Sequence, residues 1–243
     1  MSIKLGSTSY DSIYLGSTKI GTAYLGSTKV FSSADPYNPL GLPSHTIRIK
    51  YEAGNTPPIG DSQTLVDATE NIWDIYNSSN DWSILFHRSF TDRFYLLSVL
   101  GANTSGVTNM SSMFASCSVL TSVPLFDTSS VTDMSSMFED CRVLTSVPLF
   151  DTSSVTNMSS MFGSCSGLTS VPLFDTSSAT NTNGMFYICT NVQSGALALY
   201  NQCSTQTNPP ASHVDMFTGC GSNTASGTAE LAQIPASWGG TGT

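Results

Sequence analysis

The chain has 243 residues, of which only 10% are charged, and its formal net charge at pH 7 is −9. Charged residues make up about 25% of an ordinary soluble domain, so serine, threonine, asparagine and glycine must supply much of the polar surface here. From residue 94 onward the chain holds one arginine and eight carboxylates, a net charge of −7. This sign argues against binding to nucleic acids and to anionic membranes. No stretch approaches the roughly 20 apolar residues of a membrane span.

Residues 1–32 contain a ten-residue repeat with the copies IKLGSTSYDS, IYLGSTKIGT and AYLGSTKVFS. Each copy predicts two short β segments around a Gly-Ser-Thr turn, and such a unit is too short to fold alone. We predict an attachment or oligomerisation segment whose contacts come from Leu5, Ile13, Leu15, Ile20, Leu25 and Val30. The alternative is a small β-meander packed on its own chain. No charged region precedes an apolar run here, so we expect no secretory signal.

Residues 33–44 hold three prolines and predict a linker. Residues 45–78 predict a β-rich cap with strands at residues 46–51, around residues 65–66 and at residues 72–76. We expect this cap to close the N-terminal end of the repeats that follow.

A second, 24-residue repeat follows, with clear copies at 103–126, 127–150 and 151–174. A period in this range is typical of solenoids, in which each unit buries its apolar face by stacking on its neighbours. Residues 79–102 read as a degenerate first copy, with Phe86 and Phe90 in the places of Met110 and Phe114. Altered copies continue after residue 174, so we predict a solenoid with a C-terminal cap over residues 79–243.

Within a copy, apolar residues recur at i, i+3, i+4 and i+7 after Asn109, a residue favoured at helix N-caps: Met110, Met113, Phe114 and Cys117. This spacing predicts one face of a short helix. Residues 120–125 then have the L-x-x-L-x-L form of a leucine-rich-repeat strand. The predicted fold is therefore α/β, a leucine-rich-repeat-like solenoid of 24-residue repeats with a parallel sheet plus short helices, preceded by a small β-rich N-terminal module.

The unit VTNMSSMFxxCxxLTSVPLFDTSS resembles the BspA-like leucine-rich-repeat surface proteins, over roughly residues 79–238. The Leu-Gly-Ser-Thr opening and the ending AELAQIPASWGG are similar to the forms found in bacteriophages of gut bacteria. The resemblance implies a non-enzymatic protein of a surface, either of a bacterial cell, where adhesion is expected, or of a virion.

The residues that suggest chemistry recur with the repeat. Cys117, Cys141 and Cys165 hold one position, so we expect a column of buried, unbridged thiols, with Cys203 as the only candidate for an exposed thiol. Asp127-Thr-Ser recurs as Asp151-Thr-Ser, which predicts a corner held by side chain to backbone hydrogen bonds. We expect no catalytic residue, metal site or cofactor.

One comparison inside the chain indicates a surface. The second and third clear copies differ at only five positions, and four of these flank the cysteine: Glu139, Asp140, Arg142 and Val143. Stacking constrains core positions, so positions that vary freely are expected to be exposed. This strip is a candidate interaction surface, and neutral drift on a solvated edge is the alternative.

Three hypotheses follow. The first is a non-enzymatic bacteriophage virion protein that decorates the capsid or belongs to a head fibre or the tail. It would assemble in the bacterial cytoplasm, contact other virion proteins or further copies of itself through residues 1–32, and present the solenoid to a host-surface protein or glycan. The second is a bacterial cell-surface adhesin. The third is a glycan hydrolase, which needs two carboxylates paired in a groove.

Overall fold

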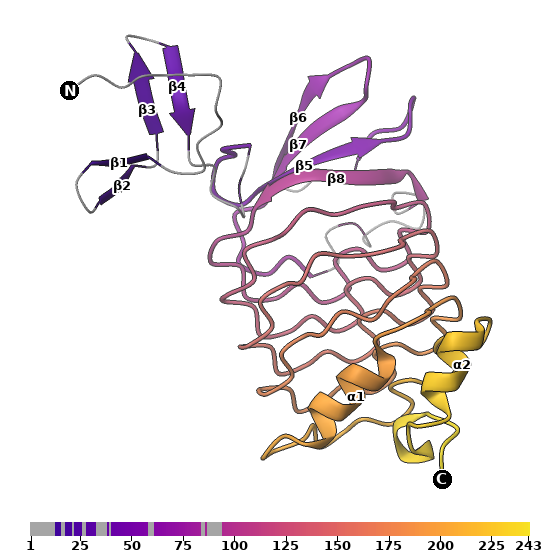
Figure 1. The fold of residues 1–243 in the computed structure, drawn as a ribbon. Coiled ribbons are helices and arrows are strands. Elements are labelled where there is room, and N and C mark those ends of the chain that lie inside the picture. Colours follow the sequence, from indigo (N-terminus) through magenta and orange to yellow (C-terminus); the bar gives the residue numbers. More distant parts are fainter. Residues whose placement is uncertain are drawn as a thin grey trace.

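The computed structural model describes residues 13–15, 18–20, 22–25, 28–32, 38, 40–57, 61–83, 86 and 94–243. In chain order these residues form two hairpins, an antiparallel sheet, a stack of coils and two helices. Figure 1 shows the stack lying between the sheet and the helices, with the N- and C-terminal parts of the chain at opposite ends.

The ten-residue repeats form the hairpins. Strands β1 (Ile13–Leu15) and β2 (Thr18–Ile20) pair antiparallel, as do β3 (Thr22–Leu25) and β4 (Thr28–Ser32). Leu5, one of the predicted contact residues, lies outside the described residues. The other five lie in the hairpin strands, namely Ile13, Leu15, Ile20, Leu25 and Val30. The predicted β segments are therefore present at these positions.

The antiparallel sheet covers one end of the stack. It has the order β6-β7-β5-β8, with β5 at Thr46–Tyr51, β6 at Ser62–Asp67, β7 at Ile72–Tyr76 and β8 at Leu96–Asn103. The three strands expected before residue 78 are present. The alternating apolar residues of β5, Ile47, Ile49 and Tyr51, are buried toward the stack. On β5's other face Arg48 donates two hydrogen bonds to Asp74 of β7, at 2.6 and 2.7 Å.

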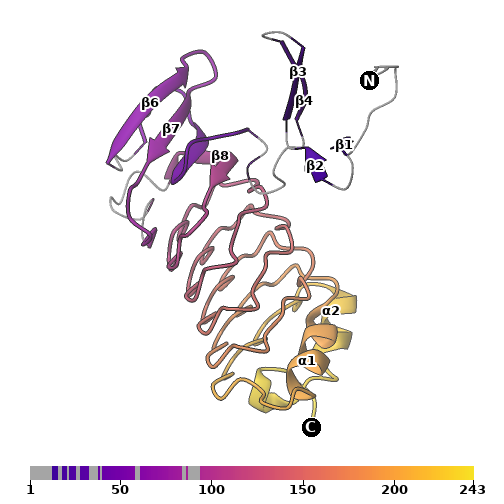
Figure 2. The same ribbon diagram turned by 90° about the vertical axis from the view of Figure 1, so that its left-hand side faces the viewer.

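Each 24-residue copy forms one coil of the stack, which we call a rung (Figure 2). Alternate backbone N–H groups donate to the next rung: those of Met110, Ser112 and Phe114 bond the carbonyls of Asp133, Ser135 and Met137 at 2.8–2.9 Å. The N–H groups between them close tight turns within the rung, as from Met113 to Met110 at 3.2 Å. The predicted helix is absent because the stack uses half of the donors that a helix would need.

The fold class predicted from the sequence is therefore wrong. Across residues 104–194, all of them described, the chain forms neither an α-helix nor a parallel sheet of extended strands. Ser112 and Ser116 have φ values of 53° and 62°, in the left-handed region that a right-handed helix excludes. The four-stranded sheet is antiparallel, and the two helices, α1 (Ala196–Ser204) and α2 (Ala225–Leu231), follow the clear copies.

The predicted strand positions form only isolated parallel bridges, such as Ser98 with Ser122 and Ser170 with Ser194. Each clear copy carries a proline two residues after the serine position of these bridges, at Pro124, Pro148 and Pro172. Proline has no N–H to donate to a neighbouring strand, so a continuous ladder cannot pass through these positions.

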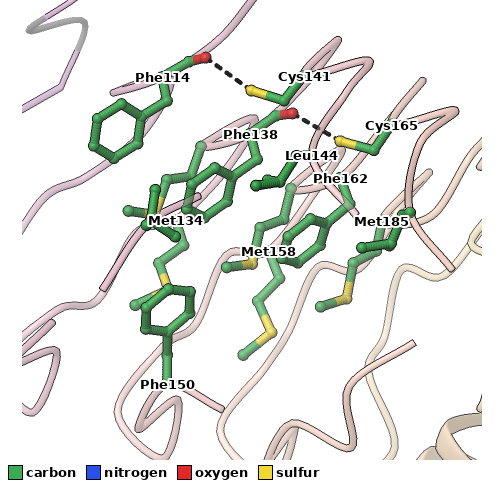
Figure 3. Packing of buried hydrophobic residues seen from close by; sticks show 14 of the residues in the cluster. Phe114, Met134, Phe138, Cys141, Leu144, Phe150, Met158, Phe162, Cys165 and Met185 are labelled. Atoms are coloured by element: carbon green, nitrogen blue, oxygen red, sulfur yellow. Dashed lines mark hydrogen bonds between the residues drawn. The ribbon is translucent and has the colours of Figure 1, made fainter. Parts of the chain in front are cut away.

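The apolar pattern nevertheless faces the core as expected. Met110, Met113, Phe114 and Cys117 are all fully buried. The phenylalanine rings stack in a column through the rungs, with centroids 5.3–6.1 Å apart in the successive pairs of Phe86, Phe114, Phe138, Phe162, Phe186 and Phe217. Figure 3 shows this column beside Phe150, which belongs to a second column, and beside the buried methionines.

The first rung differs from the predicted register. Phe86 stacks on Phe114 and so takes the place assigned to Phe90. The Thr121 hydroxyl donates to the carbonyl of Leu97, which lies one full repeat of 24 residues earlier in the chain. Phe86 precedes its stacking partner Phe114 by 28 residues, which is four more than one repeat. The first rung therefore contains four extra residues between Phe86 and Leu97, which a fixed period could not anticipate.

The far end of the stack is closed by the helices. The insertion that interrupts the period holds α1, which buries Leu199 and Cys203 against the core. The carboxylate of Glu230, from α2, accepts the N–H groups of Gly195 and Leu197 at the start of α1, where negative charge is stabilised. Cys203 is thus fully buried, and the prediction that its thiol is exposed is wrong.

Candidate functional site

The candidate strip lies on the turn between Phe138 and Leu144. Glu139 and Asp140 are half-buried there, while Arg142 and Val143 are exposed. The Arg142 guanidinium donates to the Asp140 carboxylate at 2.7 and 3.3 Å, so these two charges neutralise each other. The structure therefore separates the strip into one ion pair, one exposed apolar side chain and one carboxylate, Glu139.

Glu139 lies at one side of a groove of about 440 Å³ that crosses the rungs. The groove is lined by Glu139, Ser160, Gly163, Ser164, Asn183, Gly184, Tyr187, Val214 and Asp215. Asp140, Arg142 and Val143 do not line it. Of the four residues of the strip, only Glu139 therefore lines the groove.

The groove exists because two rungs lose a side chain. Gly163 holds the repeat position of Ala115, Glu139 and Tyr187. A methyl group built on it would meet its nearest atom, the Ser160 carbonyl oxygen, at 3.4 Å, so a side chain would fit there in ordinary van der Waals contact. Gly184 holds the position of Ser160 in the next rung, with φ of 59°. Glu139 and Tyr187 therefore flank a gap two rungs wide, about 10 Å at the usual spacing of paired chains.

The groups at the rim differ in their bonding. Asn183 accepts hydrogen bonds from Ser212 and from the Val214 N–H, at 2.9 and 2.7 Å, which fixes that rim. Asp215 accepts from the Thr218 hydroxyl at 2.9 Å. Within the part of the chain that the structure describes, the Glu139 carboxylate and the Tyr187 hydroxyl make no hydrogen bond. These two groups are therefore available to a ligand.

The spacing of the two groove carboxylates bears on the hydrolase hypothesis. Glu139 and Asp215 lie three rungs apart, which corresponds to about 14 Å along the stack. Glycoside hydrolysis needs its two carboxyl groups about 5–9.5 Å apart. Among the described residues, no group of three or more histidine, cysteine or acidic side chains could hold a metal ion.

The cysteines belong to the core. All six are buried and none forms a disulfide bond among the described residues, which confirms the predicted column of unbridged thiols. The thiols of Cys141 and Cys165 donate to the carbonyl oxygens of Phe114 and Phe138 in the preceding rungs, at 3.2 and 2.9 Å (Figure 3). Burial raises the pKa of Cys165 and of Cys220 to about 12. These thiols are therefore neutral structural groups at ordinary pH.

The raised pKa values predict a loss of stability at alkaline pH. An unfolded thiol ionises near its ordinary value of 9.0, whereas folded Cys165 keeps its proton up to about pH 12. The unfolded state therefore binds fewer protons above pH 9, and stability present below pH 9 is lost as the pH rises toward 12. We expect the free energy of unfolding, measured in urea, to fall between pH 9 and pH 10 by roughly 1 kcal/mol for each of Cys165 and Cys220.

Cys165→Ala provides the control for this prediction. The free energy of unfolding of the variant should fall less steeply with pH than that of the parent, by the contribution of one thiol, whatever the stability of the variant at pH 8. An identical pH dependence in the variant and the parent would show that Cys165 ionises equally in both states.

The corner prediction is confirmed. Asp127 accepts hydrogen bonds from the N–H and hydroxyl of Ser129, at 3.2 and 2.7 Å, and Asp151 does the same with Ser153. The buried Thr128 hydroxyl between them donates to the Asp151 carbonyl of the next rung at 2.8 Å. The Asp-Thr-Ser triplets thus hold the corners of the stack together.

The fold is a stack of short repeats, and an open groove lined by two carboxylates crosses its rungs. Residues 84–201 match the model of a family described as "Mycoplasma protein of unknown function, DUF285". This span runs from the first rung into helix α1. No curated protein matches the chain, and no solved structure matches it. No helix in the described ranges is long and apolar enough to cross a membrane.

Proposed function

We propose that this protein is a non-enzymatic structural protein of a bacteriophage particle, where it decorates the capsid or belongs to a head fibre or the tail. Residues 1–32 attach it to other virion proteins or to further copies of itself, and the stack projects its groove toward a host-surface protein or glycan. The virion context rests on the resemblance of the opening and ending segments to phage proteins.

One observation carries the attachment part of the proposal. Within the described residues, β1–β4 pair only as two separate hairpins, and neither joins the four-stranded sheet. Figures 1 and 2 both place the hairpins away from the stack. Isolated two-stranded hairpins are marginal in water, and their open edges favour pairing with another chain. The stack itself is closed at one end by the sheet and at the other by the helices, so its ends are less suited to assembly.

A second candidate, a bacterial cell-surface adhesin, is favoured by the family match over residues 84–201, because the description of that family names a bacterium. Mass spectrometry of gradient-purified phage particles separates the two. We expect peptides of this protein to copurify with the major capsid protein. Recovery from the bacterial envelope, and not from particles, would support the adhesin instead.

Deletion of residues 1–32 should remove the protein from particles while leaving the stack folded. The reason is that β5 and the following residues form their own sheet and core, to which the hairpins add no strand. The measurement is the amount of protein per particle, with circular dichroism and the melting temperature of the purified variant as the test of folding. Leu149→Ser, on an exposed residue of the stack, is the control and should be incorporated normally. Incorporation of the truncated protein at the parent level would contradict the attachment role.

A further inference from the structure

The groove carries uncompensated negative charge. Glu139 and Asp215 contribute carboxylates, and no lysine, arginine or histidine is among the lining residues. Arg142, the one lysine or arginine of the chain after residue 93, is bonded to Asp140. The groove therefore lies in a region with a net charge of −7, where a cation is attracted and an anion is repelled.

The groove also offers apolar surface. Among the lining residues, Tyr187 is 40% exposed and Val214 is 61% exposed. An aromatic ring attracts a cation placed over its face, and the methylene stem of lysine or arginine can cover apolar side chains while its charged end reaches a carboxylate. Gly163 and Gly184 also line the groove and add no side chain to it.

We propose that the groove binds a lysine or arginine side chain presented by a partner polypeptide. The head of that side chain lies against Tyr187 and bonds the Glu139 carboxylate, with Asp215 adding attraction from the far end. A neutral sugar could stack on Tyr187 but would leave both carboxylates without a counter-charge, so the charges favour a basic peptide. This inference rests on the proposed function, in that it takes the stack to be a binding surface.

The test is a titration of the full-length protein at low salt, followed by calorimetry or by NMR shifts. The probes are the peptide Arg-Gly-Arg-Gly-Arg-Gly, the same peptide with citrulline in place of arginine, and maltotriose. Citrulline keeps the shape of arginine and removes its charge. We expect the arginine peptide to bind at least about tenfold more tightly than the citrulline peptide, and to weaken steeply as salt is raised.

Three variants test whether the binding occurs in the groove. Glu139→Gln removes one carboxylate, Tyr187→Ala removes the ring, and Gly163→Gln fills the gap with a neutral side chain. Each should weaken binding of the arginine peptide by about fivefold or more: the first two each remove a contact worth about 1 kcal/mol, and the third occupies the space that the bound side chain needs. The repeat tolerates these changes, since this position holds alanine, glutamate, glycine and tyrosine in successive rungs.

Asp127→Asn is the matched control. It makes the same change in charge as Glu139→Gln but lies at a corner of the stack, where Asn103 fills the equivalent position and makes the same hydrogen bonds. It should leave binding unchanged. Equal binding of the arginine and citrulline peptides, no loss in the three groove variants, or binding of maltotriose in place of the peptide would each overturn the proposal. Absence of the protein from phage particles would overturn the virion function and leave this binding result intact.

Discussion

Replacing Phe138 with alanine should lower the free energy of unfolding by about 3–5 kcal/mol. Phe138 is fully buried, and its ring stacks between Phe114 and Phe162 with centroids 5.5 and 5.4 Å away. A third ring, Phe150, lies 6.1 Å from it (Figure 3). The substitution leaves a cavity that the neighbours cannot fill, because hydrogen bonds between rungs fix their spacing on both sides: the Phe138 N–H donates to Met161, and the Phe114 N–H donates to Met137.

Urea unfolding of the parent and the variant measures this difference. Leu149→Ala is the control in the same copy of the repeat, since Leu149 is 61% exposed and its truncation should change stability by no more than about 0.5 kcal/mol. If both substitutions lowered the free energy of unfolding by the same small amount, the phenylalanine column would not be the core of the stack.

The repeat and its buried face could be predicted from the sequence. Periodicity alone identified Met110, Met113, Phe114 and Cys117 as core residues, and all four are buried. The prediction succeeded although the backbone is not helical, because successive tight turns bring the same positions to the core side. Because each core side chain packs on its equivalent in the next rung, the apolar residues that are identical in the three clear copies are the expected core residues.

The backbone conformation could not be predicted from the same pattern. Asn109 has the residue type of a helix N-cap, and its side chain does accept the Ser111 N–H at 2.9 Å. The N–H groups of the segment after it could find hydrogen-bond acceptors either within a helix or on the next rung. The apolar spacing within one copy does not distinguish these two possibilities, because it carries no information about bonds between copies. The chain forms the stack and not the helix, because in the stack alternate N–H groups donate to carbonyl oxygens of the next rung. The left-handed serines, Ser112 and Ser116, have no distinctive sequence signal, because serine is not a residue typical of that conformation.

The candidate site was found only in part. Comparing the second and third copies identified Glu139, but that comparison could not identify Tyr187 or Asp215, which belong to later and more altered rungs. A signal was present in the next copy, where Gly184 and Tyr187 replace Ser160 and Gly163. Val143 and Arg142 are exposed, and the Asp140–Arg142 ion pair lies outside the groove.

Ser136→Pro should destabilise the protein by about 3 kcal/mol or more. Ser136 has φ of 54°, whereas proline is held near −65°, and the Ser136 N–H donates to the Ser159 carbonyl of the next rung at 2.8 Å. The substitution therefore removes a hydrogen bond between rungs and forbids the native backbone angle. A helix beginning after Asp133 would respond differently, because Ser136 would lie in its first turn, where the N–H has no partner within the helix and proline is tolerated.

Ser136→Gly is the matched control for the same position. Gly184 holds the equivalent place with φ of 59°, and glycine enters the left-handed region without the steric cost of a side chain, so stability should stay within about 1 kcal/mol of the parent or rise. Urea unfolding of both variants at one pH is the measurement. A stable proline variant together with a destabilised glycine variant is the pattern that a helix would give, and it would contradict the turn-and-stack structure. The reverse pattern is expected because, in this fold, the left-handed turn and the bond to the next rung are both made at Ser136.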